Sequence, residues 1–221
     1  IKTVLMDGYP DKCILEAAVN LNADIIVMGP KRLKGIKSRI VGSVTKSVSI
    51  STSKPALIIK PPRKEPADKM KILFATDGSD YAEKAGETLS LIPFHYNTEI
   101  TIIHVITPAF YDIPDRFMEK IEVSVREDLK KYRSMELQES QKILARTAQY
   151  LSNKFSNKER LTTMGDPSEE ILNAANEIKA DIIVVGSKGM KGFRGVVESL
   201  SRYILSVADC SVLIGKTEGF S

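Results

Sequence analysis

Short runs of apolar, β-branched residues alternate along the chain with stretches whose apolar residues recur every three or four positions. The runs predict buried strands, and the stretches predict helices that cover them. Strands are predicted at residues 1–6, 24–28, 56–60, 70–76, 99–106, 160–164, 181–185 and 212–216. Helices are predicted at residues 11–22, from 43 onward, at 80–92, within 111–155 and from 167 onward. This alternation indicates an α/β protein with a parallel, doubly wound sheet.

Part of this pattern occurs twice. Residues 8–29 match residues 165–186 at 12 of 22 positions, at a separation of 157 residues. Beyond these segments the separation becomes 156, and Ala56–Lys60 aligns with Val212–Lys216. The chain is therefore predicted to be a tandem duplication with one residue deleted in a loop of the second copy.

The two copies are unequal in length. The second copy is predicted to form a complete domain at residues 70–217, and the first copy a partial domain at residues 1–60. Residues 61–69 are predicted to be a linker, because three prolines and five charges favour an extended, solvated chain. Counted back from the repeat, the first domain would begin roughly ninety residues before Ile1, so we expect the sequence to open inside a domain.

Composition and charge narrow the class of protein. The chain of 221 residues is 43% hydrophobic and 27% charged, which is typical of a soluble globular protein. It has no apolar run near about 18 residues, so no membrane span is predicted. A net charge of +4 gives no case for nucleic-acid binding. Cys13 and Cys210 form no paired motif, which favours core positions and a reduced, cytoplasmic setting.

The candidate chemistry lies where strands end. Residues 181–185 lead directly into Gly186, and Gly189 follows three residues later. A strand, a glycine turn and a helix start present backbone N–H groups that bind phosphate oxygens in α/β sheets. Asp77 follows the strand at 70–76, and a carboxylate there accepts hydrogen bonds from ribose hydroxyls. Both features are predicted at the carboxyl ends of adjacent central strands.

Two helix starts carry local signals. Ser43 is predicted to be the N-cap of the helix that follows Gly42. Asp166 is predicted to cap the helix that begins at residue 167, with Pro167 in the first helical position and Glu169 in the third.

Structural roles stay open for several of these residues. Asp77 also suits the cap of the helix near residue 80. His104 is expected to be a core residue with a hydrogen-bond partner, and His95 a surface residue without metal-ligand spacing. Neither a Ser/His/Asp set, an HExxH motif nor a complete P-loop is present, so no catalytic residue is predicted. Basic residues near both glycine turns suit either a phosphate-facing patch or a solvated face: Lys31, Arg32, Lys34, Lys37, Arg39, Lys188, Lys191 and Arg194.

The repeat, the glycine turns and Asp77 together resemble the universal stress protein family in its tandem-domain form. The resemblance covers residues 70–216 and the second part of a domain at 1–60. It implies two tandem Rossmann-like domains, similar to adenine nucleotide alpha hydrolases, each with a five-stranded parallel sheet in the order 3-2-1-4-5. ATP-binding members carry the pattern Gly-x2-Gly-x9-Gly-(Ser/Thr) and an Asp at the end of the first strand.

The family's nucleotide-binding positions can be carried over residue by residue. In the second copy they correspond to Ala75, Thr76, Asp77, Val105, Gly186, Gly189, Ser199 and Leu200. In the first copy they correspond to Gly29, Gly42, Ser43 and Val44. The second copy departs from the pattern at Glu198, which replaces the last glycine, and in its shortened loop. The first copy departs at Arg32, which replaces a glycine, and at Pro30, which lacks a backbone N–H.

The resemblance implies an adenine-nucleotide-binding stress protein that acts as a sensor or adaptor. AMP or ATP is the expected ligand, with or without Mg²⁺. Because Glu198 would repel the outer phosphates, the second copy is predicted to favour AMP. Slow ATP hydrolysis and a nucleotide-free protein-interaction module are the two alternatives.

The last strand of each copy bears on assembly. Residues 56–60 and 212–216 are apolar strands predicted at sheet edges, and such edges pair readily. By resemblance, family dimers pair this strand across a twofold axis. We therefore predict that the two sheets meet there as an intramolecular pseudo-dimer, with a further dimer of chains as an open alternative.

Overall fold

The structure is a computed structural model that describes residues 1–29, 40–61, 69–107, 123–151, 154–155, 157–187 and 197–216. The first copy contributes α1 (Pro10–Asn20), β1 (Ile26–Met28), α2 (Ser43–Ser51) and β2 (Ala56–Ile58). The second copy contributes β3 (Lys71–Ala75), α3 (Asp80–Leu91), β4 (Glu99–Ile106), α5 (Val123–Tyr150), β5 (Asn157–Met164), α6 (Pro167–Glu177), β6 (Ile182–Gly186), α7 (Val197–Val207) and β7 (Ser211–Gly215).

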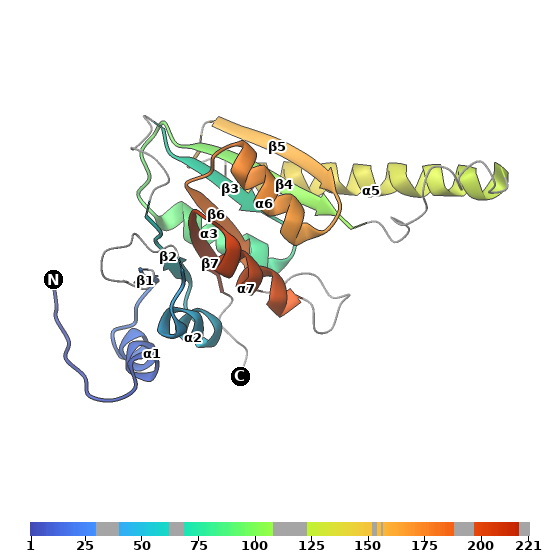
Figure 1. Cartoon of the computed structure of the whole chain (residues 1–221). Helices are drawn as coiled ribbons and strands as arrows, with labels where there is room; N and C mark the ends of the chain where they lie inside the picture. Colours follow the sequence, from blue (N-terminus) through green and yellow to red (C-terminus); the bar gives the residue numbers. More distant parts are fainter. Residues whose placement is uncertain are drawn as a thin grey trace.

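The described strands form one sheet in the order β1-β2-β7-β6-β3-β4-β5 (Figure 1). Neighbouring strands are parallel everywhere except between β2 and β7, which run antiparallel. The prediction of an α/β protein with mostly parallel strands is therefore confirmed. The sequence predicted parallel sheets for each copy, whereas the structure joins both copies into a single mixed sheet of seven strands.

The junction between the copies is the pair β2 and β7. Leu57 lies opposite Leu213, and Ile58 lies opposite Val212. Ile58, Val212 and Leu213 have no exposed surface, so the pairing also buries apolar side chains. The predicted meeting of the two last strands is confirmed, because an apolar strand edge gains both ladder hydrogen bonds and burial there.

Two helical layers cover the sheet of the second copy. Alternate residues of a strand point to opposite faces, so Leu73 packs beneath α6 and α7 while Phe74 packs beneath α3 and α5. Figure 1 shows α5 running on beyond the sheet. Its C-terminal half supplies buried Leu144 and Thr147, whereas most side chains of its N-terminal half are exposed. None of the described helices is both long enough and apolar enough to cross a membrane.

The cap at the start of α6 is as predicted. The Asp166 carboxylate accepts hydrogen bonds from the backbone N–H groups of Ser168 and Glu169, and Pro167 opens the helix. The cap predicted for α2 is wrong. Gly42 is the N-cap, and Ser43 is already the first helical residue. Gly42 is extended, and its carbonyl accepts the N–H of Lys46 at 3.0 Å, so the helix begins one residue earlier than predicted.

The strand predicted at residues 1–6 is also wrong. These residues are exposed and belong to no strand. Their aligned counterpart in the second copy lies in β5, which pairs with β4. Residues 1–6 pair with none of the described strands, and a strand without a ladder partner is not stable. The predicted linker falls mostly on residues 62–68, which lie outside the described residues.

Neither Cys13 nor Cys210 forms a disulfide bond. Cys210 is buried in the core beneath α6 and α7, as predicted. Cys13 is only half-buried, and its thiol donates to the carbonyl of Asp7 at 3.7 Å.

Candidate functional site

The candidate site of the second copy lies where β3 and β6 end. These strands are parallel neighbours, and the last pair in their register is Phe74 with Val184. Thr76 and Gly186 each follow that pair by two residues, so both lie at the carboxyl edge of the sheet. Open α/β sheets bind ligands at this edge.

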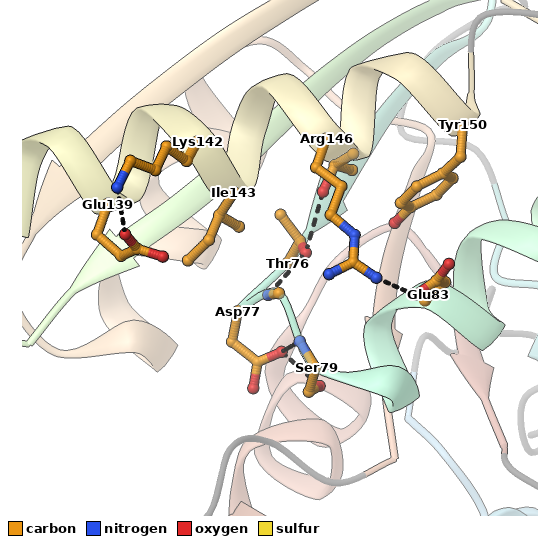
Figure 2. Close-up of a pocket in the computed structure, with 11 residues that line it drawn as sticks. Thr76, Asp77, Ser79, Glu83, Glu139, Lys142, Ile143, Arg146 and Tyr150 are labelled. Atoms are coloured by element: carbon orange, nitrogen blue, oxygen red, sulfur yellow. Dashed lines mark hydrogen bonds and ion pairs between the residues drawn. The ribbon is translucent and has the colours of Figure 1, made fainter.

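Asp77 is held in a defined conformation at this edge. One carboxylate oxygen of Asp77 accepts the backbone N–H of Ser79 at 3.0 Å and also the Ser79 hydroxyl (Figure 2). Ser79 is in turn the N-cap of α3, where its hydroxyl oxygen accepts the N–H of Ala82 at 3.3 Å. The alternative that Asp77 itself caps α3 is therefore wrong, because Asp77 positions the residue that does so.

Thr76 joins three elements beneath the carboxylate. Its backbone N–H donates to the carbonyl of Ile103 in β4 at 2.9 Å. Its hydroxyl oxygen accepts the N–H of Gly78 at 3.1 Å and a longer contact of 3.4 Å from Thr147 in α5. Thr76 is buried, so these bonds fix the turn that leads into Asp77.

A cavity of about 210 Å³ opens beside this turn, between α3 and α5 (Figure 2). It is lined by Thr76, Asp77, Gly78, Ser79, Glu83, Glu139, Lys142, Ile143, Arg146, Thr147 and Tyr150. Ligand pockets for drug-sized molecules measure about 300–1,000 Å³, so this cavity suits part of a nucleotide rather than a whole one.

Sequence reasoning missed the α5 side of this cavity. Arg146 pairs with Glu83 of α3 at 2.9 Å, and Lys142 pairs with Glu139 at 3.2 Å. The sequence predicted only a helix within residues 111–155 here, although Glu139, Ile143, Arg146 and Tyr150 recur every three or four positions and so share one face. That spacing was the available signal. The ion pairs are exposed, and each contributes no more than about 1 kcal/mol.

Tyr150 closes one end of the cavity. Burial raises the pKa of its phenol to about 12, although a hydrogen bond with Thr147 opposes that shift. Its ring lies against Gly86, where an added Cβ would stand 2.5 Å from the ring carbon Cε2. Gly86 therefore allows α3 and α5 to approach closely at this point.

His104 has hydrogen-bond partners, as predicted, but it is half-buried rather than a core residue. Its Nδ1 atom lies 2.9 Å from the Ser140 hydroxyl, which lies 2.8 Å from the Thr162 hydroxyl. Burial lowers the pKa of His104, and the negative charges of Asp77 and Glu139 act in the opposite direction. His95 is exposed, as predicted, and contacts Asn97.

The other predicted residues of the second copy are placed differently. Ala75 is buried, and Val105 packs against the core beneath α6 and α7, so neither lines the cavity. Gly186 approaches α3, since an added Cβ would stand 3.0 Å from the carbonyl carbon of Tyr81. Leu200 is half-buried in α7. Gly189 lies outside the described residues, as do the side chains of Glu198 and Ser199 in the first turn of α7.

In the first copy the structure brings the predicted residues together. Gly29 follows β1, and its carbonyl accepts the hydroxyl of Thr45 in α2 at 3.2 Å. Gly42 and Ser43 begin α2, and Val44 packs against the small core of α1, β1 and α2. Because β2 is antiparallel to β7, this site lies at the opposite sheet edge from Asp77.

The basic residues predicted after both glycine turns, at positions 31–39 and 188–194, lie outside the described residues.

A sequence model of the Universal stress protein family matches residues 1–60 and 70–216. The chain belongs to the universal stress protein family. It is 31% identical over 155 residues to universal stress protein YxiE of Bacillus subtilis, an alignment that covers 65% of this chain and 97% of that protein.

Solved universal stress protein structures share the fold. One from Archaeoglobus fulgidus has a TM-score of 0.61 at 21% identity, over 94% of this chain and 65% of that chain. Protein MJ0577, a universal stress protein of Methanocaldococcus jannaschii, has a TM-score of 0.55 at 23% identity, over 68% of this chain and 97% of that chain. At these identities the structural likeness shows the fold alone.

Proposed function

We propose that this universal stress protein binds an adenine nucleotide and acts as a sensor or adaptor in a stress response. The observation that carries the proposal is the fixed carboxylate of Asp77 at the shared carboxyl edge of β3 and β6, beside a cavity. Ribose hydroxyls would donate to this carboxylate, which is the usual role of an acid at such an edge. Nucleotide binding would favour one arrangement of the surrounding loops and so change the surface presented to a partner protein.

The tandem arrangement is part of the same proposal. Residues 70–217 would form a complete domain, and the order β5-β4-β3-β6-β7 supports the predicted order 3-2-1-4-5 for its strands. Residues 1–60 would be the C-terminal part of a first domain with its own site at Gly29, Gly42, Ser43 and Val44. A further dimer of whole chains belongs to the proposal as well.

We propose AMP as the preferred ligand of the second copy, ahead of ATP with or without Mg²⁺. Glu198 lies in the first turn of α7, the helix start that would receive the phosphates. A carboxylate about 6 Å from a phosphate charge repels it by roughly 1–3 kcal/mol at effective dielectric constants of about 20–80. ATP brings more negative charge to this helix start than AMP does, so the binding of ATP would be weakened more than the binding of AMP.

The test is a calorimetric titration of AMP and of ATP into the full chain and into Glu198→Gln. The proposal expects AMP to bind at least as tightly as ATP, and expects the substitution to strengthen ATP binding about fivefold or more while leaving AMP binding nearly unchanged. Glu177→Gln, at the end of α6, is the matched control. ATP binding ten times more tightly than AMP would reject the preference. Binding of neither nucleotide would leave the nucleotide-free interaction module, and ATP turnover abolished by Asp77→Ala would establish the slow hydrolase.

A further inference from the structure

Lys60 joins the end of the first copy to the last helix of the second. Lys60 is only 4% exposed, and no other charged residue in the described part of the chain is buried. The Nζ group donates to the carbonyl of Leu205 at 2.9 Å and to that of Ala208. The backbone N–H of Lys60 donates to the Ser211 hydroxyl at 3.1 Å.

Lys216 makes the corresponding contact from the second copy to the first. Lys216 aligns with Lys60 in the sequence repeat and follows β7 as Lys60 follows β2. Its Nζ group donates at 3.2 Å to the carbonyl of Ile50, near the end of α2. Each lysine therefore reaches the C-terminal end of the other copy's last helix. We call Lys60 and Lys216 the reciprocal lysine caps.

The topology explains why both contacts form. The last helix of each copy ends just before the last strand of that copy begins. Because β2 and β7 are antiparallel, the end of each of these strands lies beside the start of the other. A lysine just after either strand is thus placed beside the end of the opposite helix.

The chemistry of a helix end explains what the ammonium groups do there. The last four carbonyls of a helix have no partner within it, and the helix dipole makes this end negative. Leu205, Ala208 and Ile50 all lie in or next to the last turn of their helices. A buried lysine is costly unless its donors are satisfied, so this placement of Lys60 depends on those carbonyls.

We infer that the reciprocal lysine caps are positioning residues for nucleotide binding. The inference rests on the proposed function, in which phosphates contact the starts of α7 and α2. Lys60 of the first copy holds α7 of the second, and Lys216 of the second copy holds α2 of the first. Each copy thereby positions the phosphate-binding helix of the other.

Hydrogen exchange followed by mass spectrometry on the full chain tests the contacts directly. Lys60→Met should accelerate exchange of residues 200–208 about fivefold or more and leave residues 45–52 near the wild-type rate. Lys216→Met should do the reverse. Lys130→Met, an exposed lysine of α5, is the matched control and should change neither segment. Equal acceleration of both segments by either variant, or no change in either, would overturn the inference.

Calorimetric titration with AMP separates positioning from simple stabilisation. Lys60→Met should weaken the second copy's AMP binding about threefold or more, and Lys60→Arg, which keeps the charge and donors, should restore it. Unchanged affinity in a wild type that binds AMP would overturn the inference and leave the proposed function standing. Absence of AMP and ATP binding in the wild type would instead reject the proposed function and with it the nucleotide role of the caps. If Lys60→Met does not fold, the half-buried Lys216 supplies the decisive variant, read at α2.

Discussion

Replacing Gly215 by alanine should destabilise the protein more than the same change at other described glycines outside the left-handed region. Gly215 ends β7, and α3 crosses directly over it. An added Cβ would stand 2.4 Å from both Cα and Cβ of Ala85. Carbon atoms pack at about 3.5–4.0 Å, so α3 would have to move outward by roughly 1 Å.

The size of the effect follows from that overlap. Overpacking a close-fitted core costs about 1–3 kcal/mol, and the obstacle here includes helix backbone, which cannot rotate away. For a chain of this length each kcal/mol lowers the melting temperature by about 2–4 °C, so the expected fall is roughly 2–12 °C. Because Ser79 caps the same helix, AMP binding at Asp77 should weaken too.

Thermal unfolding by calorimetry and urea unfolding by circular dichroism measure the change. Gly29→Ala is the matched control, because nothing lies within 4 Å of its added Cβ. The control should stay within about 0.5 kcal/mol of the wild-type free energy of unfolding. Equal stability of the two variants would refute the close approach of α3 to β7.

Three further predictions concern the nucleotide, pH and the strand junction. Asp77→Ala should weaken AMP binding about tenfold or more, since a hydrogen bond to a carboxylate is worth roughly 1.5–3 kcal/mol; unchanged affinity in calorimetry, with the fold intact, would leave Asp77 only its bond to Ser79. Burial lowers the pKa of His104 below its unfolded value, so its contribution to stability is present above about pH 6.5 and is lost as the pH falls toward the folded pKa. Urea unfolding at pH 7.5 and pH 5.5 should therefore show a smaller loss of unfolding free energy for His104→Gln than for the wild type; the same loss in both proteins would contradict this assignment. Leu213→Lys buries an ammonium opposite Leu57 and should separate β2 from β7, which small-angle scattering would detect as an expanded chain; an unchanged radius of gyration would count against the junction.

Several strand ends and helix starts, including those around Asp77, could be predicted from the sequence because their signals are local. Asp166 with Pro167 and Glu169 gave a correct helix start, since a cap involves only the next three residues. The apolar run before Asp77 predicted a strand end there, and the repeat identified Gly29 and Gly186 as equivalent positions. The pairing of residues 56–60 with 212–216 was also accessible, because both are apolar strands at expected edges.

Other features depend on neighbours that no local pattern contains. The cap of α2 fell on Gly42 rather than Ser43 because the extended backbone of Gly42, and not the side-chain type, decided where the helix began. Residues 1–6 have a strand-like sequence but form no strand, because a strand requires a partner.

The sequence alone determined the periods, the cap of α6 and the repeat, since each depends on residues a few positions apart or on self-similarity. Tertiary structure alone decided that Arg146 meets Glu83 across the cavity and that Lys60 meets Leu205 at the end of α7. The first pair is 63 residues apart in the chain and the second 145. Such contacts form because packing and the antiparallel junction bring distant elements together. The charged groups and hydrogen-bond donors of these elements then pair with groups on the neighbouring element.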